Sequence, residues 1–206
     1  MFIYKENFHT FISDPQKIIE MLPFILLYAF SIFLALLIRE KTRHYFFQTL
    51  TKDYILSEKR NFTRFGFLSA WGTFLFLITG LGYSRSYSFN YRKLSVSKRL
   101  LILFSAPIIN FIIAGLAYYL SVSKAQIFSY KYIQIFLYFF CYTNFIVVFI
   151  NLFPFPFSDL IVIVSGFQTG LYAFEIIQII IVIIAALFKI HLYFFNYFIF
   201  LMDKII

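Results

Sequence analysis

Four long apolar stretches constrain the fold of this chain more than any other feature of its sequence. They cover residues 22–38, 100–121, 132–153 and 160–188, and a helix of roughly 20 residues crosses a hydrocarbon core of ~30 Å. Because 62% of the residues are apolar and only 13% are charged, a soluble globular domain is excluded. With a further span at Ile190–Met202, the sequence predicts an all-α polytopic membrane protein of about five or six transmembrane helices.

The segment from Phe67 to Tyr83 is less clear, because it is apolar but also contains Trp71, two threonines and three glycines. It is either a short span or a re-entrant segment packed against protein. No repeat or low-complexity linker divides the chain, so we expect a single integral membrane domain over residues 1–206. It comprises a polar N-terminal segment (1–20) without the features of a cleavable signal peptide, a core (22–188) and a C-terminal span (189–206).

Positive charge is concentrated in one region. Of the 18 lysines and arginines, 12 lie between Arg39 and Arg99, where the only acidic residues are Glu40, Asp53 and Glu58. The excess of positive charge in this region therefore equals the net charge of +9 of the whole chain. Two basic loops, 39–65 and 84–99, flank the 67–83 segment; they share one face of the membrane only if that segment is re-entrant. We expect these loops to contact anionic lipid head groups and not nucleic acid, since no aromatic residues are interleaved on a soluble module.

Polar motifs interrupt the apolar stretches in a definite order. The first span ends in Arg39-Glu40-x-x-Arg43, whose arginines have the i, i+4 spacing with which the two histidines of an HExxH helix bind zinc. The later motifs are Gly72-Thr73, Gly82-Tyr83, Asn90-Tyr91-Arg92, Ser105-Ala106-Pro107-x-x-Asn110 and Asn151-x-x-Pro154-x-Pro156-x-x-Asp159-Leu160.

This ordered set resembles the site-two protease family of intramembrane zinc metalloproteases, over residues 22–188. The family's motifs are HExxH, Gly-Thr, Gly-Trp, an Asn-Pro-Arg loop, Ala-Gly-Pro-x-x-Asn and Asn-x-x-Pro-x-Pro-x-x-Asp-Gly, of which the last is the most specific. The resemblance implies metal-ligand positions at Arg39, Arg43 and Asp159 and a general-base position at Glu40. It also implies that Asn110 and Asn151 hold a substrate strand, although both can equally serve as hydrogen bonds between helices.

The two arginines are incompatible with the zinc-dependent hydrolysis that the resemblance implies. A guanidinium has no acceptor lone pair and stays protonated, so Arg39 and Arg43 cannot bind zinc. We therefore predict that zinc is lost, that no other cofactor replaces it and that no residue is catalytically active. We expect Asp159 to pair with one arginine, and Glu40 with the other arginine or Lys41. A shifted metal set of Glu40, His44 and Asp159 is an admissible alternative.

The predicted function is that of a catalytically inactive protease relative, serving as a structural or assembly subunit of a larger membrane complex with other membrane proteins. Glu175 and Gln178, three residues apart on one helix face, are expected to meet a partner helix or subunit. The alternatives are an active intramembrane peptidase with an atypical metal site, and a channel or respiratory or ATP-synthase-type subunit.

Two further expectations concern location. The 32 phenylalanines and 16 tyrosines indicate an AT-rich genome, so we expect a mitochondrial inner membrane or the inner membrane of an AT-rich endosymbiont. His9 and His191 lie near the ends of predicted spans, and we expect both at a membrane interface.

Overall fold

A computed structural model describes residues 15–50, 70–81, 94–123, 130–152, 180–181 and 183–205 of the chain. The helices there include α2 (Pro15–Leu50), α3 (Ala70–Thr79), α4 (Val96–Val122), α5 (Lys131–Leu152) and α8 (Ile190–Ile205), and residues 180–181 and 183–187 are also helical. These described ranges contain no strand, so the predicted all-α class is confirmed. Three helices, α2, α4 and α5, are long and apolar enough to cross a membrane, as the sequence predicted for these stretches.

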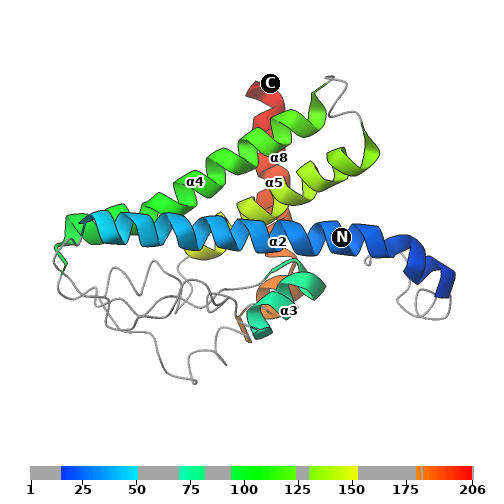
Figure 1. The fold of residues 1–206 in the computed structure, drawn as a ribbon, viewed down its shortest axis with the longest axis horizontal. Coiled ribbons are helices and arrows are strands. Elements are labelled where there is room, and N and C mark those ends of the chain that lie inside the picture. The colour runs from blue at the N-terminus through cyan, green and yellow to red at the C-terminus, as the bar shows by residue number, and fades with distance from the viewer. Residues whose placement is uncertain are drawn as a thin grey trace.

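The three long helices pack against one another and run in alternating directions (Figure 1). At one end of the bundle, the rings of Phe24 on α2 and Tyr132 on α5 are 6.2 Å apart, near the start of both helices. At the other end, Lys98 Nζ at the start of α4 donates a 3.0 Å hydrogen bond to the carbonyl of Leu50, the last residue of α2. Helices α2 and α5 are therefore parallel to each other and antiparallel to α4.

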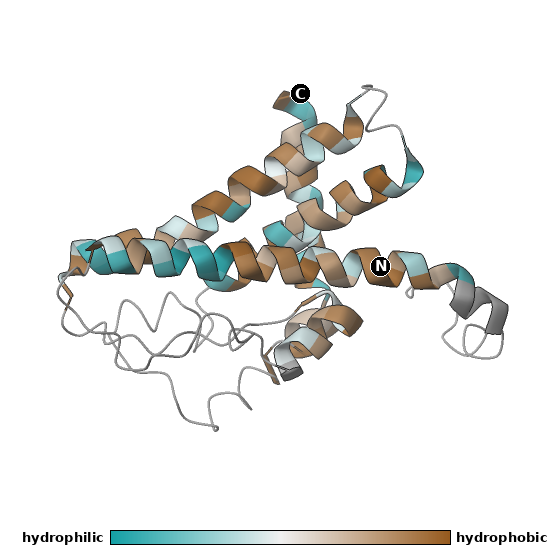
Figure 2. Cartoon of the chain, viewed as in Figure 1, coloured by the Kyte–Doolittle hydropathy of each residue, from teal (hydrophilic) through white to brown (hydrophobic). Residues whose placement is uncertain are grey.

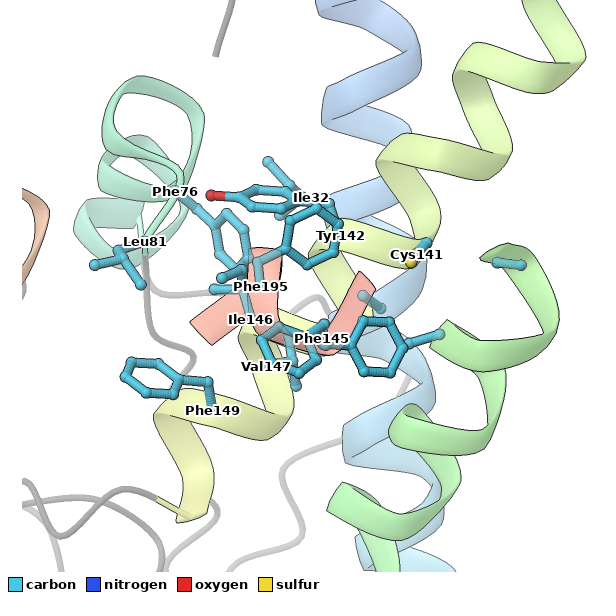
Figure 3. Packing of buried hydrophobic residues seen from close by; sticks show 14 of the residues in the cluster. Ile32, Phe76, Leu81, Cys141, Tyr142, Phe145, Ile146, Val147, Phe149 and Phe195 are labelled. Atoms are coloured by element: carbon cyan, nitrogen blue, oxygen red, sulfur yellow. The ribbon is translucent and has the colours of Figure 1, made fainter. Parts of the chain in front are cut away.

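Aromatic side chains pack with aliphatic ones in the core between these helices and the two shorter ones. Figure 3 shows Phe76, Tyr142, Phe145 and Phe195, from three different helices, meeting in one cluster. Figure 2 shows that apolar residues cover most of α4, α5 and the first half of α2, whereas polar residues are concentrated in the second half of α2. The polar part of α2 is the segment that contains the Arg-Glu-x-x-Arg motif.

Helix α3 is too short to cross a membrane. Its ten residues extend for about 15 Å, half of a hydrocarbon core. It ends at Gly80, whose φ of 77° lies in the left-handed region that glycine adopts without strain. Tyr28 on α2 donates a 3.1 Å hydrogen bond to the carbonyl of Phe76, and Tyr142 on α5 donates a 3.2 Å bond to the carbonyl of Gly80. Because Tyr142 lies at the middle of α5, α3 ends at mid-depth in the bundle.

This geometry favours the re-entrant alternative for the 67–83 segment. The chain leaves α2 at Leu50 and enters α4 beside it, at the same end of the bundle, and in between it reaches mid-depth at Gly80. Carbonyls at the end of a helix are costly in hydrocarbon unless protein groups satisfy them, and the two tyrosine hydroxyls do so here. The predicted loop 39–65 is therefore wrong for residues 39–50, which continue α2, and the rest of that loop and residues 84–93 lie outside the described part of the chain.

Helix α8 passes the middle of the bundle at Phe195. Its Phe195 ring lies 4.9 Å from that of Tyr142, and further along the helix Tyr118 of α4 donates a hydrogen bond to the carboxylate of Asp203. The predicted C-terminal helix is therefore present, but it runs from the middle of α5 toward the end of α4. Its sixteen residues extend for about 24 Å, less than a full hydrocarbon core.

His191 does not lie at an interface, contrary to the prediction. Its side chain is buried at the start of α8, and its Nε2 lies 3.5 Å from the place that a Cβ on Gly80 would occupy. The prediction was wrong because it assumed that α8 begins at the membrane surface. In the structure, the turn that precedes α8, at Phe188 and Lys189, brings the start of this helix beside Gly80.

Candidate functional site

The residues of the Arg-Glu-x-x-Arg motif form a buried ion-pair cluster, which we call the α2 triad (Arg39, Glu40 and Arg43). Glu40 Oε1 accepts one hydrogen bond from Arg39 Nη1 and another from Arg43 Nη2, each 2.7 Å long. The exposed fractions of the three residues are 4%, 0% and 2% in chain order. Charge-assisted bonds of this length are among the stronger polar contacts in proteins, so the triad is a fixed structural unit.

The position of the triad follows from the antiparallel packing of α2 on α4. Asn110 Nδ2 on α4 donates a 3.2 Å hydrogen bond to the carbonyl of Ala35, one helical turn before Arg39. Moving one turn along α2 corresponds to moving one turn back along α4, which leads to Ala106, a buried residue with a small side chain.

Asn110 and Asn151 are both buried but have different roles. The bond from Asn110 to Ala35 joins α4 to α2, as expected of an amide that holds membrane helices together. Asn151, at the end of α5, donates a 2.6 Å hydrogen bond to the carbonyl of Val147 in its own helix. The Asn110 prediction of a contact between helices is therefore confirmed, whereas the Asn151 bond lies within one helix.

Several predicted site residues lie outside the part of the chain that the structure describes. Asp159 and the prolines before it are among them, and so are the Asn90-Tyr91-Arg92 motif and the Glu175 and Gln178 pair. The contact between Asp159 and an arginine therefore remains a prediction. The companion expectation, that Glu40 pairs with one arginine or with Lys41, is met by both arginines.

Sequence reasoning missed a second polar cluster, formed by Tyr28, Tyr142 and His191 around Gly80. All three side chains come from apolar helices, and the tyrosine hydroxyls complete the hydrogen bonding at the end of α3. A usable signal was present, because tyrosines in membrane helices are concentrated at the interfaces. Two tyrosines near the middle of predicted spans indicate that backbone carbonyl groups at that depth need a hydrogen-bond donor.

The chemistry available to the α2 triad is limited by its two guanidinium groups. They donate hydrogen bonds and carry fixed positive charge, but they offer no lone pair to a metal. One carboxylate oxygen of Glu40 is occupied by two N–H donors. In the described part of the chain, no three histidine, cysteine or acidic side chains come together as a metal site would require.

Comparison with known proteins adds no assignment: no family model matches the chain, and no curated protein or solved structure is significantly similar to it.

Proposed function

We propose that the chain is a catalytically inactive relative of the site-two proteases that serves as a structural or assembly subunit of a larger membrane complex. The observation that supports this most directly is the α2 triad. At the two positions where the family has zinc-binding histidines, this chain has arginines, and both bind the carboxylate of Glu40. A site of this composition holds ion pairs in place of a metal and its activated water.

In this proposal, Asp159 completes the site from the opposite side. Both arginines are buried in the bundle, and a carboxylate in a membrane interior needs a cationic partner. The family's last motif brings its aspartate to the metal, so the same architecture brings Asp159 to the arginines that replace the metal. A core of this type, with five or six spans and one re-entrant segment, is compatible with the alternating packing of α2, α4 and α5.

Restoring the histidines tests the relationship directly. We expect the Arg39→His/Arg43→His variant, purified without chelators, to bind about one zinc per chain, since Asp159 would supply the third protein ligand of a catalytic-type site. The measurement is elemental analysis of the protein peak after size-exclusion chromatography. The same variant with Asp159→Asn is the matched control and is expected to retain at most a weakly bound ion.

Two results would count against the proposal. If the double-histidine variant folds but binds no zinc, the architecture does not bring Asp159 to this site. If instead the unmodified protein binds zinc and loses it on His44→Ala or Asp159→Asn, the shifted metal set exists and the chain is an atypical peptidase. The channel or energy-coupling alternative predicts ion flux that changes on Glu175→Gln in reconstituted vesicles.

The assembly role has its own test. We expect native mass spectrometry of the protein, extracted in mild detergent from its own membrane, to show it bound to other membrane subunits. Anionic lipids are expected to remain bound, because Lys98 and Arg99 lie together at the end of the bundle where α2 ends and α4 begins. A chain that is consistently extracted without any other subunit would contradict the assembly role, while leaving the zinc test unaffected.

A further inference from the structure

One face of α8 presents three polar side chains and one phenylalanine to the surroundings of the bundle. Tyr193, Asn196, Tyr197 and Phe200 are all exposed, and their spacing of i, i+3, i+4 and i+7 places them on one side of the helix. We call this side the α8 outer face. The opposite side of the helix carries buried residues, including Phe195 and Phe198, that pack on the bundle. The α8 outer face is therefore turned away from the rest of the described chain.

The depth of this face in the membrane follows from its neighbours. Asn196 comes directly after Phe195, whose ring lies 4.9 Å from the ring of Tyr142 at the middle of α5. Lys204, near the end of α8, is eight residues further on, or about 12 Å along the axis. Asn196 is therefore close to the middle of the hydrocarbon, while Lys204 is close to its edge.

A polar amide in this position is not explained by contact with lipid. The side chain of asparagine has two hydrogen-bond donors and an acceptor oxygen with two lone pairs, and lipid tails satisfy none of them. Tyrosine in membrane proteins is concentrated at the interfaces, yet Tyr193 and Tyr197, which are 73% and 61% exposed, flank Asn196. Three outward hydrogen-bonding groups near the middle of the membrane indicate a protein neighbour.

We propose that the α8 outer face binds the same face of a second copy of the chain across a two-fold axis. In such a contact each patch meets itself, so its groups must be self-complementary. An asparagine amide meets this condition, because it both donates and accepts, and a tyrosine hydroxyl does so as well. This partner goes beyond the proposed function and does not depend on any relationship to a protease.

The charges near this face are compatible with pairing. The four residues of the α8 outer face carry no formal charge, so two copies meet without repulsion at the crossing point. Lys204 lies over the ring of Phe200, with its Nζ 4.3 Å from the ring centroid. In a pair that crosses at Asn196, the two Lys204 side chains are about 12 Å from the crossing, at the aqueous edge, where repulsion between ammonium groups is weak.

A cross-linking experiment in lipid vesicles tests this contact. The Asn196→Cys variant of the full chain is expected to form a reducible dimer, at twice the 24.6 kDa mass of the chain, on mild oxidation. A disulfide requires Cα atoms within about 7 Å, which only residues near the two-fold axis achieve. Ile112→Cys is the matched control, because Ile112 is exposed near the middle of α4 and is expected to remain monomeric under oxidation. The native Cys141 is buried and is therefore not expected to cross-link.

A second measurement does not depend on introducing cysteine. The unmodified protein is expected to be dimeric in vesicles by single-molecule photobleaching, and Asn196→Leu is expected to raise the dimer dissociation constant by about 3- to 30-fold. Ile112→Leu is expected to leave the dimer dissociation constant unchanged. The proposal is overturned if folded Asn196→Cys gives no dimer, if the unmodified protein is monomeric, or if Asn196→Leu has no effect. It is equally overturned if Asn196→Cys cross-links to a different protein or within its own chain.

Discussion

Glu40→Gln is expected to destabilise the protein by about 3–5 kcal/mol, the range found when one member of a buried ion pair is removed. The substitution keeps the size of the side chain but removes the charge that Arg39 and Arg43 share. Two guanidinium groups that are almost fully buried then lose their bound carboxylate. The measurement is the midpoint of unfolding in mixed micelles of mild and denaturing detergent.

Glu20→Gln is the matched control, because Glu20 is exposed near the start of the same helix. It removes the same charge and is expected to change stability by less than about 0.5 kcal/mol. Equal effects of the two substitutions would mean that the α2 triad contributes little to the fold.

A combined variant separates the triad from its proposed fourth member. Replacing Arg39, Glu40 and Arg43 together by Met, Leu and Met removes all three charges, and such replacements are often neutral or stabilising when the ion pairs are complete in themselves. If Asp159 pairs with the arginines, this variant is instead destabilised, and adding Asp159→Asn restores stability. Without that pairing, Asp159→Asn has no restoring effect.

Gly80→Ala is expected to cost about 2–4 kcal/mol. The left-handed φ of 77° adds about 1–2 kcal/mol for any residue with a Cβ. The new Cβ would also overlap the hydroxyl oxygen of Tyr142, which donates to the Gly80 carbonyl, and losing that bond costs about 1 kcal/mol. The same detergent unfolding assay measures the change.

Two further variants make the Gly80 result specific. Gly115 lies inside α4, and a Cβ added there would be at an ordinary contact distance of 3.5 Å from Met202 on α8. Gly115→Ala is therefore expected to be neutral or to stabilise the protein by up to about 1 kcal/mol. In a Tyr142→Phe background the hydroxyl is absent, so Gly80→Ala is expected to cost less than in the unmodified protein. Equal costs in both backgrounds would show that the overlap with Tyr142 has no energetic weight.

The long helices were predictable from sequence because their signal is local. Apolar stretches at 22–38, 100–121 and 132–153 predict α2, α4 and α5, since any helix of that length and composition is stable in a membrane. The extension of α2 to Leu50 was not predicted, because the apolar signal stops at Arg39 while the helix continues through the polar motif. Hydrophobicity therefore located the spans but not the end of this helix.

The arrangement of the polar residues was harder to predict. The i, i+4 spacing placed Arg39 and Arg43 on one face of a helix, but it did not show that Glu40 holds both of them. His191 was misplaced because its environment is created by Gly80, more than a hundred residues earlier in the chain. Contacts of this kind depend on which helices meet and at what depth, and neither hydrophobicity nor local spacing determines these.

The paired ends of α2 and α4 also bear on how the chain enters its membrane. Lys98 and Arg99 lie at that end, at the start of α4, so the positive-inside rule predicts that this end faces the side where synthesis takes place. In that orientation the start of α2 and the end of α8, which lies beside Tyr118, are both on the far side. We therefore expect the amino end of α2 to be translocated before α4 and α5 insert.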